Sequence, residues 1–534
     1  MSFYDDASLV FLPSGEAGKD GKAYSMKPTN GNGDFTFSRG SNLTATRVDS
    51  NGLIEKGREN LLLQSNQFDT TAWNISNVLG GQEGYDGTND AWLQSGTSRL
   101  QQAISLSTGV YTFSLYLKGG YSNYCEIRVV GSISIVLRYE LTGNGSIITS
   151  SSAIDSKIDL IGNGWYKVSG TFNASVTTFR IYPKDDSSGS QSSSSSVYVQ
   201  DAQLEQGLVA TEYIESGASR GKAGLLEHSP RFDYSGGASC PSLLLEPSRS
   251  NEIGYSEYFE GWTPQGSPTI TSNFGTSPEG LQNSSRLRYT TDSDYIETSI
   301  TNTSGVFSIY AKGTGNLILT DSGANASSTT ALTSSYQRID LYFSTNTTTL
   351  QIKTDSSGLD AEVYGAQFEN ATYETSYIPN HSGGSVTRNA DSCLINPMDT
   401  TYSTNYTFYG EFERIVSEDE ESILMQLYDG NASATNQYRI MNRTNAQLRT
   451  RIYFTGSNTS IISDTDSFQL GQTIKWAVKY DREVIKVFID GQEIGSTTQA
   501  VGGIDVISLE RMKVKQILLF DSTLSDANCI TLTS

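Results

Sequence analysis

The chain has 534 residues, too many for one hydrophobic core, so we expect three or four domains. Its 37 basic and 58 acidic residues give a formal net charge of -21, which disfavours nucleic acid as a partner because phosphate backbones repel an acidic protein. No apolar run approaches the roughly 20 residues that span a bilayer, and residues 1–6 lack the order of a signal peptide. Abundant Gly, Ser, Thr, Asn and Tyr predict an all-β protein with many turns.

Residues 1–50 are predicted to form a separate N-terminal segment. A short apolar run at 9–12 is stopped by Pro13, and a second strand at 34–40 follows a Gly/Asn-rich turn at 30–33. Two short strands cannot bury enough surface by themselves. We therefore expect this segment to pack on a neighbouring module or on a partner subunit.

The stretch at 52–73 returns in degraded form at 249–262. Arg, Asn, Ser, Phe and Trp recur in the same order, and three of them keep their spacing: Asn60, Ser65 and Phe68 in the first copy, and Asn251, Ser256 and Phe259 in the second. One module has therefore been used twice. We place the first copy at 51–217 and the second at 218–390.

Further matched blocks follow in the same order in both copies. Residues 111–118 alternate apolar and polar side chains, which predicts a half-buried strand, and 307–313 repeat the pattern F-S-[LI]-Y-x-K-G. The blocks at 199–205 and 363–369 share A-Q-[LF]-E, and a T-x-Y-I element follows each of them. Two tandem jelly-roll β-sandwiches, with about eight strands each, explain this order.

Beyond residue 390 the repeat disappears, and 391–534 are predicted to form a third β-domain. A hairpin turn is expected at Asp490-Gly491, a dipeptide that favours the positive φ angles of a two-residue turn. Alternating or apolar runs predict strands at 473–480, 484–489, 507–509 and 514–520.

The sequence offers little material for catalysis. Its two histidines, His228 and His381, lie in Ser/Gly/Pro-rich stretches, so we do not expect Ser-His or Cys-His nucleophilic catalysis. A polysaccharide-degrading enzyme would need two carboxylates facing each other across a sugar-binding groove, and no spacing marks such a pair. The four cysteines lie far apart and are predicted to be reduced thiols.

Aromatic residues are the predicted glycan contacts, because β-sandwiches bind sugars with flat rings and hydrogen-bonding edges. The four tryptophans in repeat or strand positions are expected to be core residues: Trp73, Trp165, Trp262 and Trp476. Trp92 and the outward-facing Tyr116 and Tyr310 are expected to contact glycan.

Two aspartate pairs suggest a structural calcium ion. Asp292 and Asp294 form one pair, and Asp464 and Asp466 form the other. Carboxylates two residues apart on a loop suit a hard cation, but neither pair continues into a full twelve-residue calcium loop. No other cofactor is expected.

Several blocks resemble a known family, the structural head and tail fibre proteins of tailed bacteriophages. Similarity to their N-terminal region lies at 24–28, 34–41, 45–48 and 52–66. The A-Q-[LF]-E and T-x-Y-I pattern resembles their carbohydrate-binding-module-like jelly rolls. The last domain is similar to concanavalin A-like and laminin G-like sandwiches at 476–481, 487–491 and 524–526.

This resemblance implies a protein of the virion surface that is made in the cytoplasm of a bacterial host. We expect a non-enzymatic fibre or decoration protein, homo-oligomeric, attached to capsid or tail through 1–50, whose β-modules hold host-surface polysaccharide. The alternative is a purely structural linker between virion proteins without a ligand. A polysaccharide-degrading enzyme ranks third.

Overall fold

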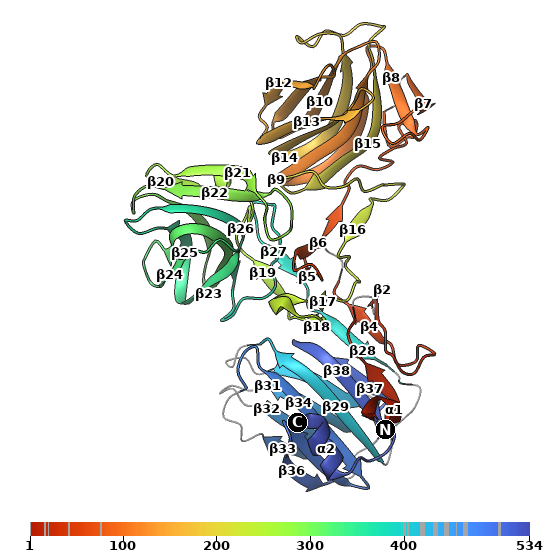
Figure 1. The fold of residues 1–534 in the computed structure, drawn as a ribbon, viewed down its shortest axis with the longest axis vertical. Coiled ribbons are helices and arrows are strands. Elements are labelled where there is room, and N and C mark those ends of the chain that lie inside the picture. Colours follow the sequence, from red (N-terminus) through yellow and green to blue (C-terminus); the bar gives the residue numbers. More distant parts are fainter. Residues whose placement is uncertain are drawn as a thin grey trace.

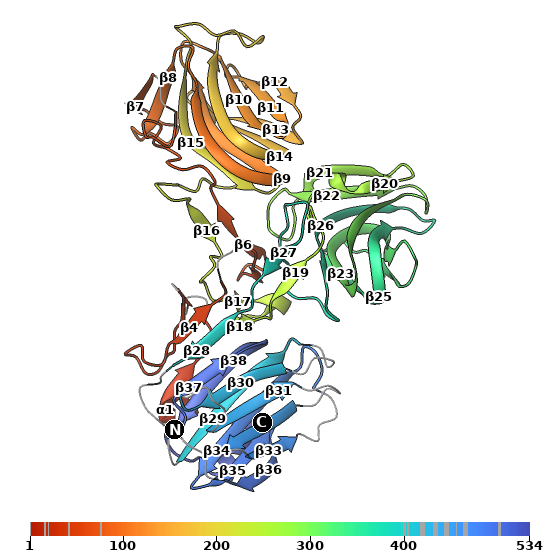
Figure 2. The same ribbon diagram turned by 180° about the vertical axis from the view of Figure 1, so that it is seen from behind.

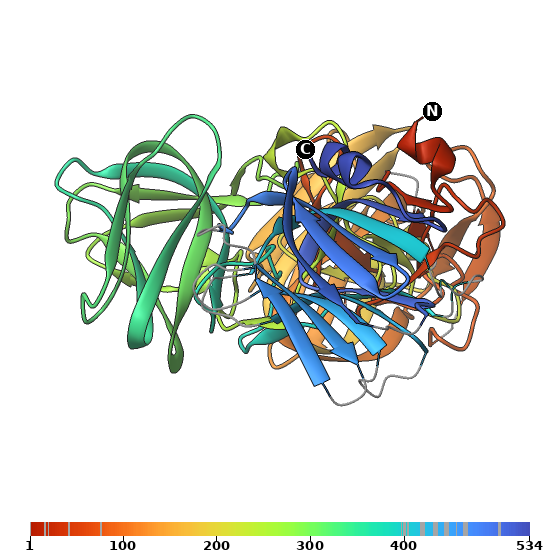
Figure 3. The same cartoon turned by 90° about the horizontal axis from the view of Figure 1, so that it is seen from below.

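The computed structural model describes residues 2–14, 18–19, 21–40, 43–74, 77–396, 398, 402, 405–416, 422–430, 436–442, 448–454, 457–462, 468–499 and 503–534. The fold is all-β, as predicted, with the helices α1 (Phe3–Asp6) and α2 (Asp526–Thr533) near the two ends. Neither helix is long and apolar enough to cross a membrane. Three lobes meet at a central region, and the second lobe projects sideways from the other two (Figures 1 and 3).

The first lobe is a nine-stranded sheet folded over itself into a sandwich. Its order is β12-β11-β10-β14-β9-β15-β8-β7, with β13 also on β14. The two longest strands of this lobe, β9 and β14, pair along their length, and both curve with the sheet (Figure 1). The strands are β7 (Val78–Gln82), β8 (Ala91–Ser95), β9 (Leu100–Gly119), β10 (Tyr124–Gly131), β11 (Ser134–Glu140), β12 (Ser146–Ser151), β13 (Asp155–Gly162), β14 (Trp165–Lys184) and β15 (Ser196–Gln206).

The second lobe repeats this plan with seven strands. Its central strand β23 pairs with β25 and β26 in the way that β9 pairs with β14 and β15. The duplication seen in the sequence is therefore a duplication of strand pairing. The strands are β20 (Thr263–Gln265), β21 (Thr269–Gly275), β22 (Ser284–Tyr289), β23 (Tyr295–Asp321), β24 (Ser327–Ala331), β25 (Gln337–Lys353) and β26 (Leu359–Glu369).

The repeated asparagine closes each module at its entrance. In the first copy the buried Asn60 amide donates hydrogen bonds to the carbonyls of Ala202 and Ile214. Its oxygen accepts hydrogen bonds from the backbone N–H groups of Leu62 and Leu204. The second copy makes the same four bonds from Asn251, to Ala366, Ile378, Ile253 and Phe368. The repeated motif thus satisfies buried backbone groups, which explains its retention in both modules without any ligand.

The third lobe is a sandwich of two sheets that contains both ends of the chain (Figure 1). One sheet has the order β17-β18-β38-β29-β34-β35-β36, with β1 also on β38, and the other has the order β2-β3-β4-β28-β37-β30-β31-β32-β33. The strands from the C-terminal part are β28 (Ser392–Ile395), β29 (Asn405–Arg414), β30 (Ser422–Tyr428), β31 (Asn436–Asn442), β32 (Leu448–Phe454), β33 (Ser457–Ile462), β34 (Thr473–Asp481), β35 (Val484–Ile489), β36 (Gln492–Thr498), β37 (Val506–Leu509) and β38 (Met512–Phe520). The predicted hairpin turn at Asp490-Gly491 is confirmed, with φ of 44° and 81°.

The segment 1–50 packs on a neighbouring module, as we expected, but its strands are part of the third lobe and do not form a separate unit. Its apolar run becomes β1 (Leu9–Phe11), which lies along β38, and its second strand becomes β4 (Phe35–Ser38), which pairs with β28. Short apolar strands remove the most surface from water by completing an existing sheet. The remaining strands added to this lobe are β2 (Gly18–Lys19), β3 (Lys22–Ala23), β17 (Phe232–Asp233) and β18 (Ser242–Leu245).

The central region, which we call the hub, is built from 43–60, 214–251 and 376–391. It contains the entrances of both modules and joins the three lobes (Figure 2). Its short strands are β5 (Thr46–Val48), β6 (Ile54–Glu59), β16 (Lys222–Gly224), β19 (Arg249–Asn251) and β27 (Val386–Arg388), and it contains a short 3-10 turn at Ser235–Gly237; a second such turn, Phe259–Gly261, lies in the second lobe.

A buried ion network ties the hub to the third lobe. Arg231 pairs with Glu246 and Asp391, Arg388 pairs with Glu246 at 2.8 Å, and Arg39 pairs with Asp391 at 3.5 Å. All five side chains are almost inaccessible to solvent. Buried charges of this kind are tolerated only when they are paired.

A second network ties the hub to the first two lobes. Lys56 of β6 lies 2.9 Å from Glu257 and 3.2 Å from Glu279, both in the second module. Arg58 contacts Glu279 and also Glu205 of the first lobe. The two networks together fix the three lobes to one buried centre.

Candidate functional site

Aromatic rings gather on the outward face of the first lobe, where β14, β9 and β15 lie side by side. Tyr116 on β9 lies opposite Lys167 on β14 and Gln200 on β15. The next outward row across the three strands is Trp165, Lys118 and Tyr198. The alternate side chains of these strands, such as Leu115 and Leu117, fill the core.

Tyr85, from the loop between β7 and β8, covers part of this face. Its ring stacks on Tyr116 with the centroids 3.6 Å apart and the planes 9° apart. Its hydroxyl donates to Asp201 at 3.0 Å, and its backbone N–H donates to the Gln200 side chain. The Lys167 ammonium lies 5.7 Å from the Tyr116 centroid. Flat rings with charged and amide groups beside them are the composition of a sugar-binding surface.

Trp165 forms the inner edge of the same cluster. Its ring meets those of Tyr85 and Tyr198, each with centroids 6.4 Å apart, and the Lys118 ammonium lies about 6 Å from Trp165 and Tyr198. Trp165 is buried, whereas Tyr85, Tyr116 and Tyr198 are half-buried and present ring surface. We call these four rings, with Lys118 and Lys167, the ring face.

Tyr310 occupies on the second lobe the position that Tyr116 occupies on the first. It lies opposite Arg338 on β25, whose guanidinium carbon is 5.4 Å from the ring centroid, and opposite Tyr364 on β26. Tyr310 borders a cavity of about 500 Å³ that also reaches Glu374 and the third lobe. The ring-and-cation pair is therefore duplicated, and its second copy faces another lobe.

Trp92, the third predicted glycan contact, is held in a different setting. Its indole N–H donates to the Asn66 carbonyl at 3.0 Å, and its ring lies edge-on to Phe68, a core residue. The side chain is half-buried. These contacts give Trp92 a packing role at the margin of the first-lobe core.

Tyr85 and Tyr198 did not emerge from the sequence as site residues. The alternation through 196–200 marks Tyr198 as outward-facing, so that signal was available. Tyr85 lies in a loop without periodicity, and only the tertiary structure places it on Tyr116.

Asp201 lies at a bulge of β15, where its φ is 53° and the register on β9 shifts. The same bulge recurs at Gly365 in the second lobe, with φ of 65°. Burial raises the pKa of Asp201 from the usual 3.8 to about 6, and the nearby Asp90 and Asp86 contribute to the rise. The carboxyl group beside the ring face therefore changes charge near pH 6.

Because the folded-state pKa of Asp201 lies above its unfolded value, its ionisation disfavours the folded first lobe, and stability falls as pH rises from about 4 to 7. Asp201→Asn removes the charge and tolerates the left-handed backbone. We expect this variant to raise the free energy of unfolding by about 1–2 kcal/mol at pH 7.5 and to change it little at pH 4, as measured by urea unfolding.

Asp294→Asn is expected to lower the free energy of unfolding at pH 7.5, because the ionised Asp294 carboxylate stabilises the folded state. The hydrogen bond from the backbone N–H of Ser267 is the first of several that lower the pKa of Asp294 to about 2. A stabilisation by Asp201→Asn of equal size at pH 4 and pH 7.5 would contradict the role of ionisation.

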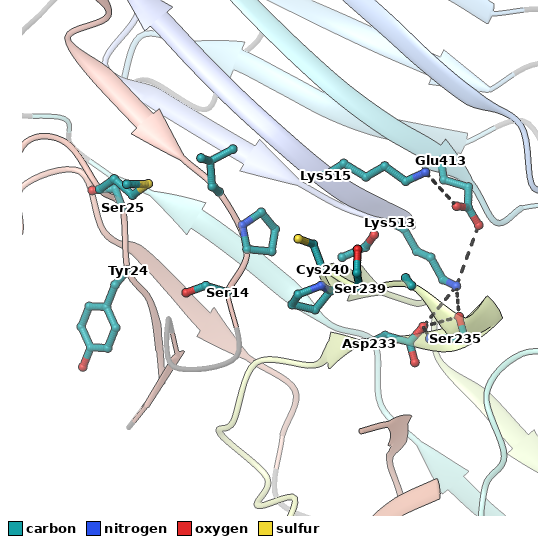
Figure 4. Close-up of a pocket in the computed structure, with 16 residues that line it drawn as sticks. Ser14, Tyr24, Ser25, Asp233, Ser235, Ser239, Cys240, Glu413, Lys513 and Lys515 are labelled. Atoms are coloured by element: carbon teal, nitrogen blue, oxygen red, sulfur yellow. Dashed lines mark hydrogen bonds and ion pairs between the residues drawn. The ribbon is translucent and has the colours of Figure 1, made fainter. Parts of the chain in front are cut away.

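A larger cavity, of about 890 Å³, opens on the third lobe between the N-terminal segment, the loop before β18 and the outer face of β29 and β38. Lys513 and Lys515 both reach Glu413 there, and Lys513 also pairs with Asp233 at 3.1 Å (Figure 4). Tyr24 is the aromatic residue of the lining, and its ring points away from these charges (Figure 4). The paired charges offer hydrogen bonds without a ring for a sugar to stack on.

Of the two predicted calcium pairs, Asp292 and Asp294 lie within the described residues, and their carboxylates have different surroundings. Asp464 and Asp466 lie outside the described residues. Asp292 is exposed, while the Asp294 carboxylate accepts hydrogen bonds from the backbone N–H groups of Ser267, Thr290 and Thr291. Within the described ranges, no three His, Cys, Asp or Glu side chains are grouped to bind a metal ion.

The two histidines lie in different environments. His381 is buried in the hub, 3.9 Å from Glu257, and burial lowers its pKa to about 4, so the imidazole is neutral at pH 7. His228 is exposed. The four cysteines are unpaired thiols, and three of them are buried.

Solved structures similar to parts of this chain are β-sandwich domains. They include the CBM40 of a Ruminococcus gnavus IT-sialidase bound to α2,3-sialyllactose (14% identity, TM-score 0.22, 25% of this chain and 84% of that one) and a heptameric SAP-like pentraxin from Limulus polyphemus (11%, 0.22, 26% and 73%). Domain 4 of the arabinanase AbnA from Geobacillus stearothermophilus, in complex with arabinotriose, is a third (10%, 0.22, 27% and 73%). The likeness concerns the fold alone. No protein-family model and no curated protein sequence matches the chain.

Proposed function

We propose that the chain is a non-catalytic glycan-binding protein that holds polysaccharide on the ring face of the first lobe and on Tyr310 in the cavity between the second and third lobes. The observation that supports this most strongly is the stack of Tyr85 on Tyr116, with Asp201, Gln200 and Lys167 around it. A pyranose has an apolar face and a hydroxyl-bearing edge. The rings suit the first, and the charged and amide groups suit the second.

Two such surfaces on one chain favour weak binding that is strengthened by multivalency. Tyr310 with Arg338 repeats on the second lobe the pair that Tyr116 forms with Lys167 on the first. A polysaccharide that reaches both surfaces gains affinity through effective concentration, and an oligomer would gain more.

The resemblance to phage fibre proteins supports a location on a virion surface, with synthesis in a bacterial cytoplasm. Because 1–40 contributes strands to the third lobe, attachment to capsid or tail would use that lobe as a whole. Immunogold labelling of purified particles tests this placement. Label that is absent from particles would refute the virion assignment and leave the glycan-binding proposal standing.

A rigid linker without ligand is the second candidate, and the buried ion networks of the hub favour it. They tie three lobes together in the way that a spacer between virion proteins requires. Tight binding to a capsid or tail protein, together with a blank glycan array, would favour this candidate over the first.

Removing both stacked rings should weaken glycan binding. The double variant Tyr85→Ala with Tyr116→Ala is expected to lower apparent affinity for array-selected glycans about tenfold, because it removes the stacking surface of the first lobe. Biolayer interferometry on the immobilised glycan measures the change.

Two variants serve as controls for this measurement. Tyr85→Phe with Tyr116→Phe keeps the rings and should retain most of the affinity. Tyr4→Ala removes an exposed ring on the third lobe and should have no effect. If the alanine double variant binds as tightly as wild type while remaining folded, the ring face is not the binding surface.

A further inference from the structure

A second face of the first lobe gathers positive charge in a chain whose net charge is -21. It is the outward face of β11, β10 and β14, on the side away from the core residues Ile127, Leu137 and Ile181. Cross-strand register brings four cations and two carboxylates together there: Arg128, Arg138, Arg180, Lys184, Glu126 and Glu140. We call this set the basic face.

One end of the basic face is neutralised and covered. Glu126, almost fully buried, accepts from Arg128 at 2.7 Å and from Arg138 at 2.5 Å. The loop 185–190 closes over this end, where the Ser187 carbonyl accepts a hydrogen bond from Arg138. Arg138 is 13% exposed there, against 37% for Arg128.

Arg180 is not neutralised. It lies directly opposite Arg128 on the neighbouring strand, although like charges at opposed positions destabilise an antiparallel pair. Within the described part of the chain, Arg180 has no acidic partner, and its Nε–H is buried without an acceptor. An anion-binding site explains why the guanidinium groups of Arg128 and Arg180 lie side by side although their repulsion destabilises the strand pair.

We propose that Arg180 and Arg128 bind the carboxylate or sulfate groups of an acidic polysaccharide. Guanidinium groups hold such anions through paired, charge-assisted hydrogen bonds. Arg128 and Lys184 both lie over the ring of Tyr182, at 5.5 and 5.0 Å from its centroid, which keeps the cations in place. The acidic remainder of the chain repels a phosphate backbone, so it favours a polymer with widely spaced anions over nucleic acid.

The second lobe lacks this feature. At the positions of Arg128 and Arg180, its strands β23 and β25 carry Thr320 opposite Gln351, and the next outward pair is Ile318 opposite Lys353, whose ammonium rests over the Tyr295 ring. The basic face therefore belongs to one copy of the duplicated module. Lys353 also provides a matched control, because its replacement changes the charge of the chain by the same amount.

Affinity electrophoresis of the full chain tests the proposal, in gels containing hyaluronan, dextran sulfate or neutral dextran. We expect hyaluronan, dextran sulfate or both to retain the wild type, with Arg180→Gln about tenfold weaker and Lys353→Gln unchanged. The two acidic polymers distinguish carboxylate from sulfate. Because Arg180→Gln removes a like-charge contact, its unfolding midpoint should not fall.

Two outcomes would overturn the proposal at once, namely equal retention of Arg180→Gln and wild type, or no retention of the wild type by either acidic polymer. A parallel gel that contains duplex DNA provides a third overturning outcome. If DNA retains the wild type more strongly than both polysaccharides do, and Arg180→Gln loses this retention, the basic face binds nucleic acid. Tyr85 and Tyr116 are unchanged in this variant, so failure here is distinct from failure of the ring face.

Discussion

Replacing Arg231 by alanine is expected to destabilise the protein by about 3–5 kcal/mol. The guanidinium group is fully buried and pairs with Glu246 and Asp391, so its loss leaves two carboxylates in the hub with fewer partners. Arg388 and Arg39 still contact these carboxylates but do not replace the missing bonds. Urea unfolding followed by tryptophan fluorescence measures the effect.

The matched control is Arg220→Ala. Arg220 pairs with Glu59 at 3.1 Å on the surface, with side chains 38% and 25% exposed, and exposed pairs contribute at most about 1 kcal/mol. If the two arginine variants unfold at the same urea concentration, the hub network does not hold the lobes together.

Asn60→Ala and Asn251→Ala are each expected to cost about 2–4 kcal/mol, since each substitution leaves four buried backbone groups without a partner. Because the two side chains make the same bonds, the two losses should be similar and should appear in the first and second lobes respectively. Hydrogen exchange with mass spectrometry localises each loss to its lobe.

Asn51→Ala is the control for this pair, because Asn51 is exposed and its amide donates a hydrogen bond to Asp49, two residues earlier. Its substitution should leave unfolding unchanged. A loss below about 1 kcal/mol for either buried asparagine would show that the repeated motif is not retained for its hydrogen bonds.

The sequence allowed the duplicated modules to be predicted because their signal is local. Asn60 and Asn251 recur at fixed spacing from Ser and Phe, and alternation marks the strands that carry Tyr116 and Tyr310. Of the four tryptophans expected in cores, Trp73, Trp262 and Trp476 lie in them, whereas Trp165 is buried on the outward face beside Tyr85 and Tyr198. Each of these features depends on neighbours within a few residues.

Long-range pairing could not be predicted in the same way. β1 has three residues, and nothing in its sequence specifies β38 as its partner more than 500 residues away. Tyr85 reaches the ring face from an irregular loop, and Arg180 meets Arg128 only through the register of β10 on β14. Contacts of this kind come from tertiary packing, so the sequence indicated two of the site's rings and missed the rest.

The pairing of β1 with β38 in the third lobe has a consequence for synthesis on the ribosome. Leu9 pairs with Leu519, so at about 5–20 residues per second the first strand waits roughly 25–100 s for its partner. The first two lobes can fold during translation, whereas β4 stays unpaired until β28 emerges and β1 until β38 emerges. A prematurely terminated chain would therefore carry exposed apolar strand edges, a target for chaperones and proteases.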